Sequence, residues 1–288
     1  MDFYSAALLQ GLGFAAMGLG IYISLRIFNI PDITTDGSYT LGGAITAVLL
    51  TGGYNPAIVM LLAVTGGALS GMASGLIHTR LKVNPLLSGI LVMTALYSIN
   101  LSIMGRSNLP LMNGNTIFQS YLFTGQEHIN QWIVFLFVTI LISVMLVLLL
   151  KTDFGIAMRA TGNNGQMVRA MGMNTDTMKV FGLALANGLT ALSGYLLVQY
   201  QGFADINMGI GIVISGLAAV MIGEAFAVVL KTRSILINII LVIAGSIIFR
   251  LILAFTLTLG LNPNYLKLVT AVIVLLILFL TRFRNRAL

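Results

Sequence analysis

The chain consists of long apolar runs separated by short polar breaks. Most runs are close to the roughly 20 residues that an α-helix needs to cross the hydrocarbon core of a membrane. The pattern predicts an all-α integral membrane protein, a multi-span bundle of about 8–10 spans with broken helices at the polar interruptions. The second run is short, so whether residues 33–52 cross the membrane or re-enter is left open. The runs are 4–25, 39–52, 56–77, 85–104, 131–150, 178–200, 208–230, 234–258 and 264–281.

The composition agrees with this pattern. Hydrophobic residues make up 58% of the chain and charged residues 8%, against roughly 25% charged in soluble domains. Residues 1–288 are therefore predicted to form one transmembrane domain. The net charge of +7 is spread over the segments that flank the apolar runs, which argues against nucleic acid as a partner and is compatible with contact to membrane lipid.

No motif of a catalytic or ATP-binding site occurs in the sequence. The phosphate-binding pattern G-x-x-x-x-G-K-[ST] and the zinc motif H-E-x-x-H are absent, and there is no cysteine. We therefore expect no catalytic residue, no metal site and no cofactor bound by this chain. If ATP drives its function, the ATPase is another chain.

The basic residues predict the orientation, because Lys and Arg in short loops stay on the cytoplasmic side. If the polar segment 159–179 is cytoplasmic, twelve of the fifteen basic residues lie inside, the N-terminus lies outside and the C-terminus is cytoplasmic. Only Arg106, Arg250 and Lys267 fall elsewhere. The twelve are Arg26, Arg80, Lys82, Lys151, Arg159, Arg169, Lys179, Lys231, Arg233, Arg282, Arg284 and Arg286.

Two stretches of the chain resemble each other at a shift of 173 residues. "DITTDGSYTLGGAITAVLL" at 32–50 aligns without gaps with "DINMGIGIVISGLAAVMIG" at 205–223. The two stretches start five spans apart, so a true repeat would be inverted, as in many transporters. This interpretation divides the chain into 1–150 (first half plus fifth span), 151–177 (a cytoplasmic loop) and 178–288 (second half).

Polar residues crowd into the break after the first run. In "PDITTDGSYT", Pro31 fixes its own backbone and the Asp, Thr and Ser side chains can cap the helix that follows. One interpretation is a capped interhelical loop, and the other is a broken helix that faces a water-filled path. On the second interpretation the path residues are Asp32, Thr35, Asp36, Tyr39, Asp205 and Asn207.

Two further charges lie in or beside apolar runs. Glu224 is close to Lys231 and Arg233, so it is either a solvated or paired carboxylate or a gating or docking residue. Arg250 lies well inside the eighth run, where a cation is costly and needs a partner that the sequence does not identify.

The polar segment "RATGNNGQMVRAMGMNTDTMK" at 159–179 contains one short predicted helix, about 163–171. Asn163 or Asn164 would cap it and Gly172 would end it. Such a helix is too short to be stable alone, so it needs a partner surface. It lies either on the membrane face or in a groove of a cytoplasmic protein.

The segment "TDFGIAMRATGNNGQMVRAMGMNTDTMKVFGLALANGLTALSGYLLVQYQG" resembles the permease subunits of bacterial ABC importers of the branched-chain-amino-acid and ribose type. "SGLAAVMIGE" resembles the small-residue helix of that family's second half. "IPDITTDGSYTLGGA" is similar to a narrower branch, the permeases paired with tryptophan/tyrosine-binding lipoproteins.

The resemblance implies a function and a set of partners. The chain would be the permease of an importer in the bacterial cytoplasmic (inner) membrane, and would carry a small solute, an amino acid and in that branch an aromatic one. A cytoplasmic ABC ATPase dimer would bind ATP and Mg, a second permease chain would form a homodimer, and a solute-binding lipoprotein would dock outside, at 105–130 and 201–207. The 163–172 segment would be the coupling helix, with ATPase contacts at Arg159, Gly162, Asn163, Gln166, Arg169 and Gly172.

Two other functions remain open. An ion- or proton-coupled secondary transporter uses similar broken helices but needs intramembrane carboxylates, whereas Asp32, Asp36, Asp205 and Glu224 are predicted near span ends. A membrane scaffold or receptor would leave solute uptake unchanged when the chain is removed. Dependence on ATP and a partner distinguishes the importer from both.

Overall fold

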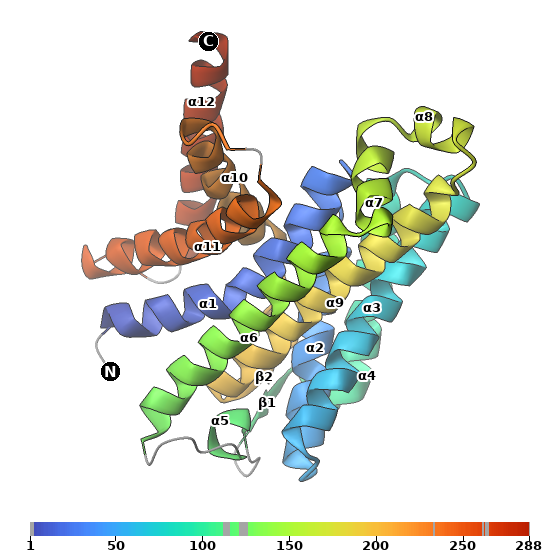
Figure 1. The fold of residues 1–288 in the computed structure, drawn as a ribbon. Coiled ribbons are helices and arrows are strands. Elements are labelled where there is room, and N and C mark those ends of the chain that lie inside the picture. The colour runs from blue at the N-terminus through green and yellow to red at the C-terminus, as the bar shows by residue number, and fades with distance from the viewer. Residues whose placement is uncertain are drawn as a thin grey trace.

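The computed structural model describes residues 3–111, 116–120, 126–232, 234–260, 262 and 265–287, with the side chains of 280–287 outside this description. Arg233 and parts of 105–130, and the side chains of Arg282, Arg284 and Arg286, therefore lie outside the described residues. The chain forms a helical bundle with one small sheet (Figure 1). Its elements are α1 (Phe3–Ile21), η1 (Tyr22–Ile27), α2 (Thr34–Thr51), α3 (Pro56–Arg80), α4 (Pro85–Met104), β1 (Asn108–Pro110), α5 (Ile117–Ser120), α6 (Glu127–Lys151), α7 (Asp153–Asn163), α8 (Gly165–Ala170), α9 (Thr175–Gln201), β2 (Phe203–Asp205), α10 (Ile212–Val229), α11 (Ile235–Thr258) and α12 (Leu266–Ala287).

The predicted all-α membrane fold is confirmed. Among the described residues, seven helices are long and apolar enough to cross a membrane. The α2 and α12 helices correspond to the remaining two predicted runs. The short second run is part of one uninterrupted 18-residue helix, α2, which rises about 27 Å.

Helix starts and ends follow local sequence. Asn55 and Asn84 precede prolines, and each side chain accepts a hydrogen bond from the backbone N–H two residues on, at 2.9 Å. Proline suits the first helical position because its missing N–H would have no partner there. The α4 and α9 helices end at Gly105 and Gly202, which have φ values of 66° and 79°. These glycines take a left-handed conformation that other residues rarely adopt.

The α2 and α9 helices form the centre of one side of the bundle. Most of α2 is buried, and it packs on α3, α4 and α9. Glycines allow this close approach, since a Cβ at Gly42 would overlap the carbonyl of Ala191 and a Cβ at Gly194 the carbonyl of Tyr39. Small residues at such contacts are typical of helix packing in lipid, where apolar burial alone gives little driving force.

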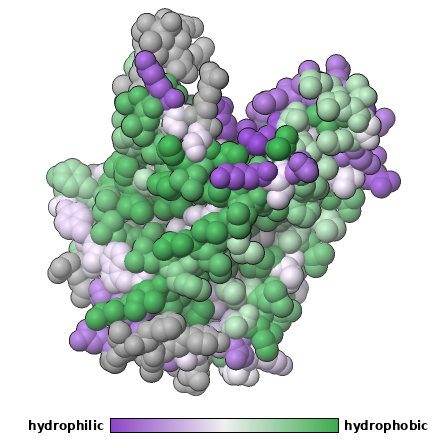
Figure 2. Space-filling model, in the orientation of Figure 1, coloured by the Kyte–Doolittle hydropathy of each residue, from purple (hydrophilic) through white to green (hydrophobic). Residues whose placement is uncertain are grey.

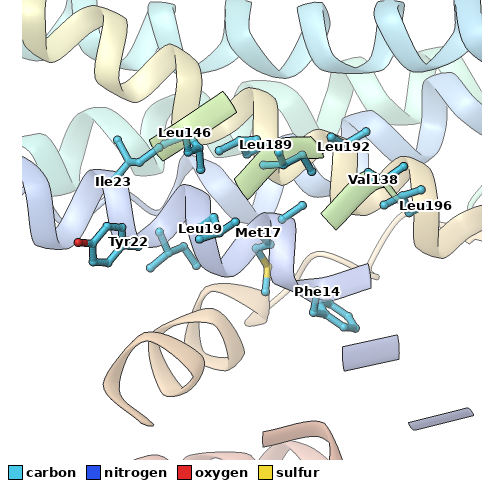
Figure 3. Close-up of a cluster of buried hydrophobic side chains, with 14 of the residues drawn as sticks. Phe14, Met17, Leu19, Tyr22, Ile23, Val138, Leu146, Leu189, Leu192 and Leu196 are labelled. Carbon is cyan, nitrogen blue, oxygen red and sulfur yellow. The ribbon is translucent and has the colours of Figure 1, made fainter. Parts of the chain in front are cut away.

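The largest core cluster lies where α1, α6 and α9 meet (Figure 3). Phe14, Met17, Leu19 and Ile23 of α1 and η1 belong to this cluster, together with side chains of the other two helices. Those labelled in the figure are Val138 and Leu146 of α6 and Leu189, Leu192 and Leu196 of α9. In Figure 2 hydrophobic side chains cover the middle of the visible face, and hydrophilic ones gather over the end that carries α7 and α8. This end is called the α8 end below.

Two halves of the chain pack in a similar way. The α1 helix packs on α10 and α11, and α9 packs on α2 and α3. If α1–α4 are matched in order with α9–α12, each half therefore packs its first helix on the second and third helices of the other half. The inverted repeat, whose evidence was the 173-residue shift, stays a prediction. The sheet joins the halves, because β1 and β2 pair antiparallel with Asn108 opposite Asp205.

Candidate functional site

The polar segment between α6 and α9 contains two helices rather than one. The predicted short helix is α8, which is capped by the Asn164 side chain accepting from the Met167 N–H at 3.0 Å. Gly172 follows it with φ 83°, as expected of a residue that ends a helix. The helix α7, which the sequence interpretation treated as loop, begins where the Thr152 hydroxyl accepts from the Gly155 N–H.

The six predicted ATPase contacts fall into two groups. Asn163, Gln166, Arg169 and Gly172 are exposed on the α8 end. Gly162 instead packs inward, since a Cβ there would overlap the carbonyl of Ile27. Arg159 is half-buried, and its Nε is buried without a hydrogen-bond partner among the described residues.

The helix α8 presents an unpartnered apolar side. Met167 and Met171 are 58% and 67% exposed, whereas Val168 is buried and anchors the helix to the bundle. Arg169 lies between the methionines, and its Nε donates to the Gly165 carbonyl at 3.3 Å. This combination of exposed methionines and a cation can dock against a partner protein.

The break between η1 and α2 lies deep in the bundle. Asp32 is 6% exposed, and its carboxylate accepts from the Thr34 N–H at 2.9 Å and from the Asn187 amide at 2.7 Å. The Ser38 hydroxyl donates to Asn187 Oδ1 and lies 2.6 Å from the Ser70 hydroxyl. Asn187 is about halfway along α9, so the prediction that Asp32 lies near the end of a span is wrong. Backbone that leaves a helix at this depth needs such polar partners.

Asp36 joins the two halves of the chain. Its carboxylate accepts from the backbone N–H of Gly211 and of Val213, both at 2.8 Å. It therefore caps α10 and not the start of α2, in whose first turn it lies. The negative charge also lies at the positive end of the α10 dipole.

The other predicted path residues are placed separately. Thr35 is buried and donates to the Asp32 carbonyl at 3.2 Å. Tyr39 is buried with its ring stacked on Phe14. Asp205 and Asn207 lie at the opposite end of the bundle from α8, where Asp205 accepts from the Asn108 amide and from the Asn207 N–H. The structure thus brings Asp32, Thr35 and Asp36 together and leaves Asp205 and Asn207 at the surface.

Glu224 forms an ion pair with Arg26 over a cavity of about 640 Å³ at the α8 end. The two charged groups are 2.8 Å apart and join η1 to α10. Tyr22, Lys231 and Asn238 also line the cavity. A π-helix such as η1 is rare and is often found at a functional site.

The partner of Arg250 is an aromatic ring. Its guanidinium Cζ lies 3.5 Å from the centroid of Phe14. A cation over an aromatic face is stabilised by the ring quadrupole, more so where water is excluded. The sequence did not identify a partner for Arg250, and this contact supplies one.

Sequence interpretation missed a polar face on α4. Thr94, Ser98 and Ser102 recur every four residues and are exposed, as is Tyr97. Behind them Asn100 is 1% exposed, and its Oδ1 has no hydrogen-bond partner among the described residues. The hydroxyl spacing within an otherwise apolar run was the signal that could have found this face.

No group of three or more His, Cys, Asp or Glu side chains that could hold a metal ion occurs within the described part of the chain.

Comparisons with known proteins agree with the helical pattern. The sequence family described as branched-chain amino acid transport system / permease component matches residues 3–279. The tyrosine transport system permease protein of Clostridioides difficile (strain R20291) is 39% identical over 270 residues, covering 92% of this chain and 87% of the relative. An uncharacterized protein of Rickettsia prowazekii (strain Madrid E) is 32% identical over 275 residues, covering 95% of each chain.

A solved structure has a similar fold. It is a metal-chelate type ABC transporter in an inward-facing conformation, with a TM-score of 0.53 and 13% sequence identity. The match covers 98% of this chain and 85% of the other. At this identity the likeness concerns the fold alone.

Proposed function

Because the chain belongs to the family of branched-chain amino acid transport system permease components, we propose that it forms the translocation path of an ABC importer. A separate cytoplasmic ATPase dimer binds ATP and Mg and drives alternating access, so the chain itself is not an enzyme. The exposed α8 helix supports the proposal, because Met167 and Met171 are exposed, and Arg169, also exposed, donates to the Gly165 carbonyl of its own helix.

The proposed path runs between two copies of the chain. Thr94, Ser98 and Ser102 place hydroxyls on the outer face of a helix that is otherwise apolar. The Thr94 and Ser102 hydroxyls donate to carbonyls of their own helix, at 2.7 and 2.8 Å. Their oxygens can still accept a hydrogen bond, which a water-filled path between two permease chains supplies and lipid does not. We take the second permease chain to be another copy of this one, so that both sides of the path are formed by the same outer face of α4.

The proposed solute is an amino acid, and an aromatic one is favoured. The support is the 39% identical relative, which is a tyrosine transport system permease protein. We place the chain in the bacterial inner membrane with its α8 end and C-terminus in the cytoplasm. A solute-binding lipoprotein docks at the opposite end, where 105–130 and 201–207, the two candidate docking segments, are joined by the β1–β2 pairing.

Reversing the charge of Arg169 tests the coupling proposal. Arg169→Glu is expected to lower the amount of ATPase that co-purifies with this chain by about tenfold or more, since loss of an interfacial charge contact commonly costs 2–5 kcal/mol. Gly172→Trp is expected to act in the same direction, because φ 83° strains any residue with a Cβ. Membrane insertion of both variants stays normal.

Lys151→Glu is the matched control, as it makes the same charge change at an exposed residue outside α8. Quantitative mass spectrometry of the affinity-purified complex measures the ATPase. Wild-type recovery with both the Arg169 and Gly172 variants would refute the assignment of α8 as the coupling helix.

The Arg26–Glu224 pair is the proposed gate at the α8 end. Glu224→Lys is expected to raise basal ATPase activity of the reconstituted complex by up to about fivefold, because it replaces an ion pair worth about 0–1 kcal/mol with repulsion. The melting temperature stays within about 2 °C of wild type. The double variant Arg26→Glu/Glu224→Arg restores basal activity if the contact matters, and unchanged ATPase activity in Glu224→Lys argues against a gate.

One observation favours the secondary transporter as a second candidate. Asp32 lies at mid-height of α9, where a coupling carboxylate could act. Its two hydrogen bonds, to Thr34 and Asn187, fit a structural role equally well. Solute uptake by vesicles that contain this chain but no ATPase would favour the secondary transporter.

A further inference from the structure

The cavity beside the Arg26–Glu224 pair carries more positive than negative charge. Its volume of about 640 Å³ is that of a ligand site and not of a packing gap. Of the described residues that line it, Arg26 and Lys231 are cations and Glu224 is the acid. The charge of Arg159 on α7 also acts on Tyr22 in the cavity wall. The cavity therefore favours a ligand with a negative charge.

Both lining cations still have hydrogen-bond donors to offer such a ligand. Arg26 pairs with Glu224 through Nε, and its side chain is 64% exposed. The two terminal nitrogens of this guanidinium carry further N–H groups. Lys231 is exposed, and its ammonium group forms no ion pair within the described part of the chain. A guanidinium and an ammonium group together are suited to bind the oxygens of a phosphate.

An apolar surface adjoins the cavity. Val228 lines the cavity and is 47% exposed, and Val229 and Leu230 follow it in the chain with exposed side chains. They lie at the end of α10, a helix long and apolar enough to span a membrane. Inorganic phosphate gains nothing from such a surface, whereas the acyl chains of a phospholipid pack on it.

We propose that this cavity binds the phosphate group of an anionic phospholipid between Arg26 and Lys231, with the acyl chains along the end of α10. Basic pockets between membrane helices bind lipid headgroups through the same groups. The Thr232 hydroxyl and the Asn238 amide line the cavity and can bond to the rest of the headgroup. Arg26 is then shared between the phosphate and Glu224, so the lipid acts on the pair that we propose as the gate. This last consequence rests on the proposed function, and the lipid site does not.

The test is a titration of the full chain, in neutral detergent, with short-chain phosphatidylglycerol and with the matching phosphatidylcholine, which has no net charge. Native mass spectrometry measures the bound fraction. Lys231→Gln keeps the length of the side chain and removes the charge, and is expected to weaken phosphatidylglycerol binding about fivefold, the factor for one basic residue near a lipid headgroup. Glu224→Gln removes the acid that competes for Arg26, and is expected to strengthen binding by about the same factor.

Lys82→Gln is the matched control. Lys82 and Lys231 each come shortly after the end of a helix, are exposed, and have left-handed backbones with φ values of 54° and 50°. Lys82 does not line the cavity. The variant is expected to bind phosphatidylglycerol as wild type does, because the charge that it loses lies elsewhere on the surface.

The outcomes separate the lipid site from its rivals. Equal binding of the two lipids by wild type, or an equal fall in Lys82→Gln and Lys231→Gln, would overturn it. Saturable binding of inorganic phosphate that depends on Lys231, without binding of phosphatidylglycerol, would keep the phosphate chemistry and overturn the lipid as its source. Unchanged lipid binding by Lys231→Gln together with a lower recovery of the ATPase would assign Lys231 to a protein contact instead.

The test is also independent of the proposed function. The titration uses neither ATPase nor solute, so a failure of the lipid site leaves the importer in place. Failure of the wild-type chain to recover an ATPase would overturn the importer and leave the lipid site in place.

Discussion

Replacing Asp36 with alanine is expected to lower the melting temperature of the purified protein by on the order of 10 °C and to abolish solute uptake. The carboxylate is 5% exposed and accepts from the N–H groups of Gly211 and Val213. Alanine would leave both half-buried donors without this partner, at up to about 1–3 kcal/mol each. At roughly 2–4 °C per kcal/mol for a chain above 150 residues, the shift is well within reach of a thermal unfolding assay in detergent.

Asp36→Asn separates charge from hydrogen bonding at the same position. Its amide oxygen can accept only one of the two bonds, so we expect about half of the fall in melting temperature. Asp176→Ala is the control, because Asp176 is an exposed aspartate in the first turn of α9. A melting temperature for Asp36→Ala equal to wild type would show that the α10 start does not depend on this contact.

The proposed function suggests a place for this contact in the transport cycle that can be tested. Asp36 belongs to α2 and its partners to α10, so it fixes a helix of the first half of the chain to one of the second. Alternating access moves parts of a permease relative to each other, and such a contact either persists as a pivot or breaks in one state. Uptake lost in Asp36→Asn with only a moderate fall in melting temperature would support a role in the transport cycle.

A larger residue at position 71 is expected to prevent assembly of the bundle. Gly67, Gly71 and Gly75 face α9 at a spacing of four residues, which brings the two helices together. A Cβ at Gly71 would overlap the carbonyl oxygen of Leu183, a backbone atom that cannot turn aside as a side chain can. Overpacking typically costs about 1–3 kcal/mol even where side chains can adjust.

We therefore expect Gly71→Ala to lower the melting temperature and Gly71→Leu to give no monodisperse peak by size-exclusion chromatography in detergent. Ala73→Leu is the control, because Ala73 is exposed on the same helix and has room for a larger side chain. Normal yield and elution of Gly71→Leu would mean that α3 and α9 can separate without loss of the fold.

Much of α8, the proposed coupling helix, could be predicted from sequence. The caps and glycine of α8 are local signals within a few residues, so its position was predicted to within two residues at each end. The inward packing of Gly162 was not predictable, because its partner Ile27 is more than a hundred residues away in sequence. The helix α7 had a local signal in Thr152, which the apolar-run pattern did not use.

By itself the sequence determined the long apolar helices, the breaks between them, and the family that the chain belongs to. These follow from run length, capping residues and motifs, all of which act over short stretches of chain. Only the tertiary structure decided that Asp36 caps α10, that Asp32 bonds to Asn187 and that Arg250 lies on Phe14. In a membrane helix nearly every position is apolar, so periodicity does not distinguish the face toward lipid from the face toward the core. The sequence therefore shows that the few polar side chains need partners, and the packing of the helices determines which residues those partners are.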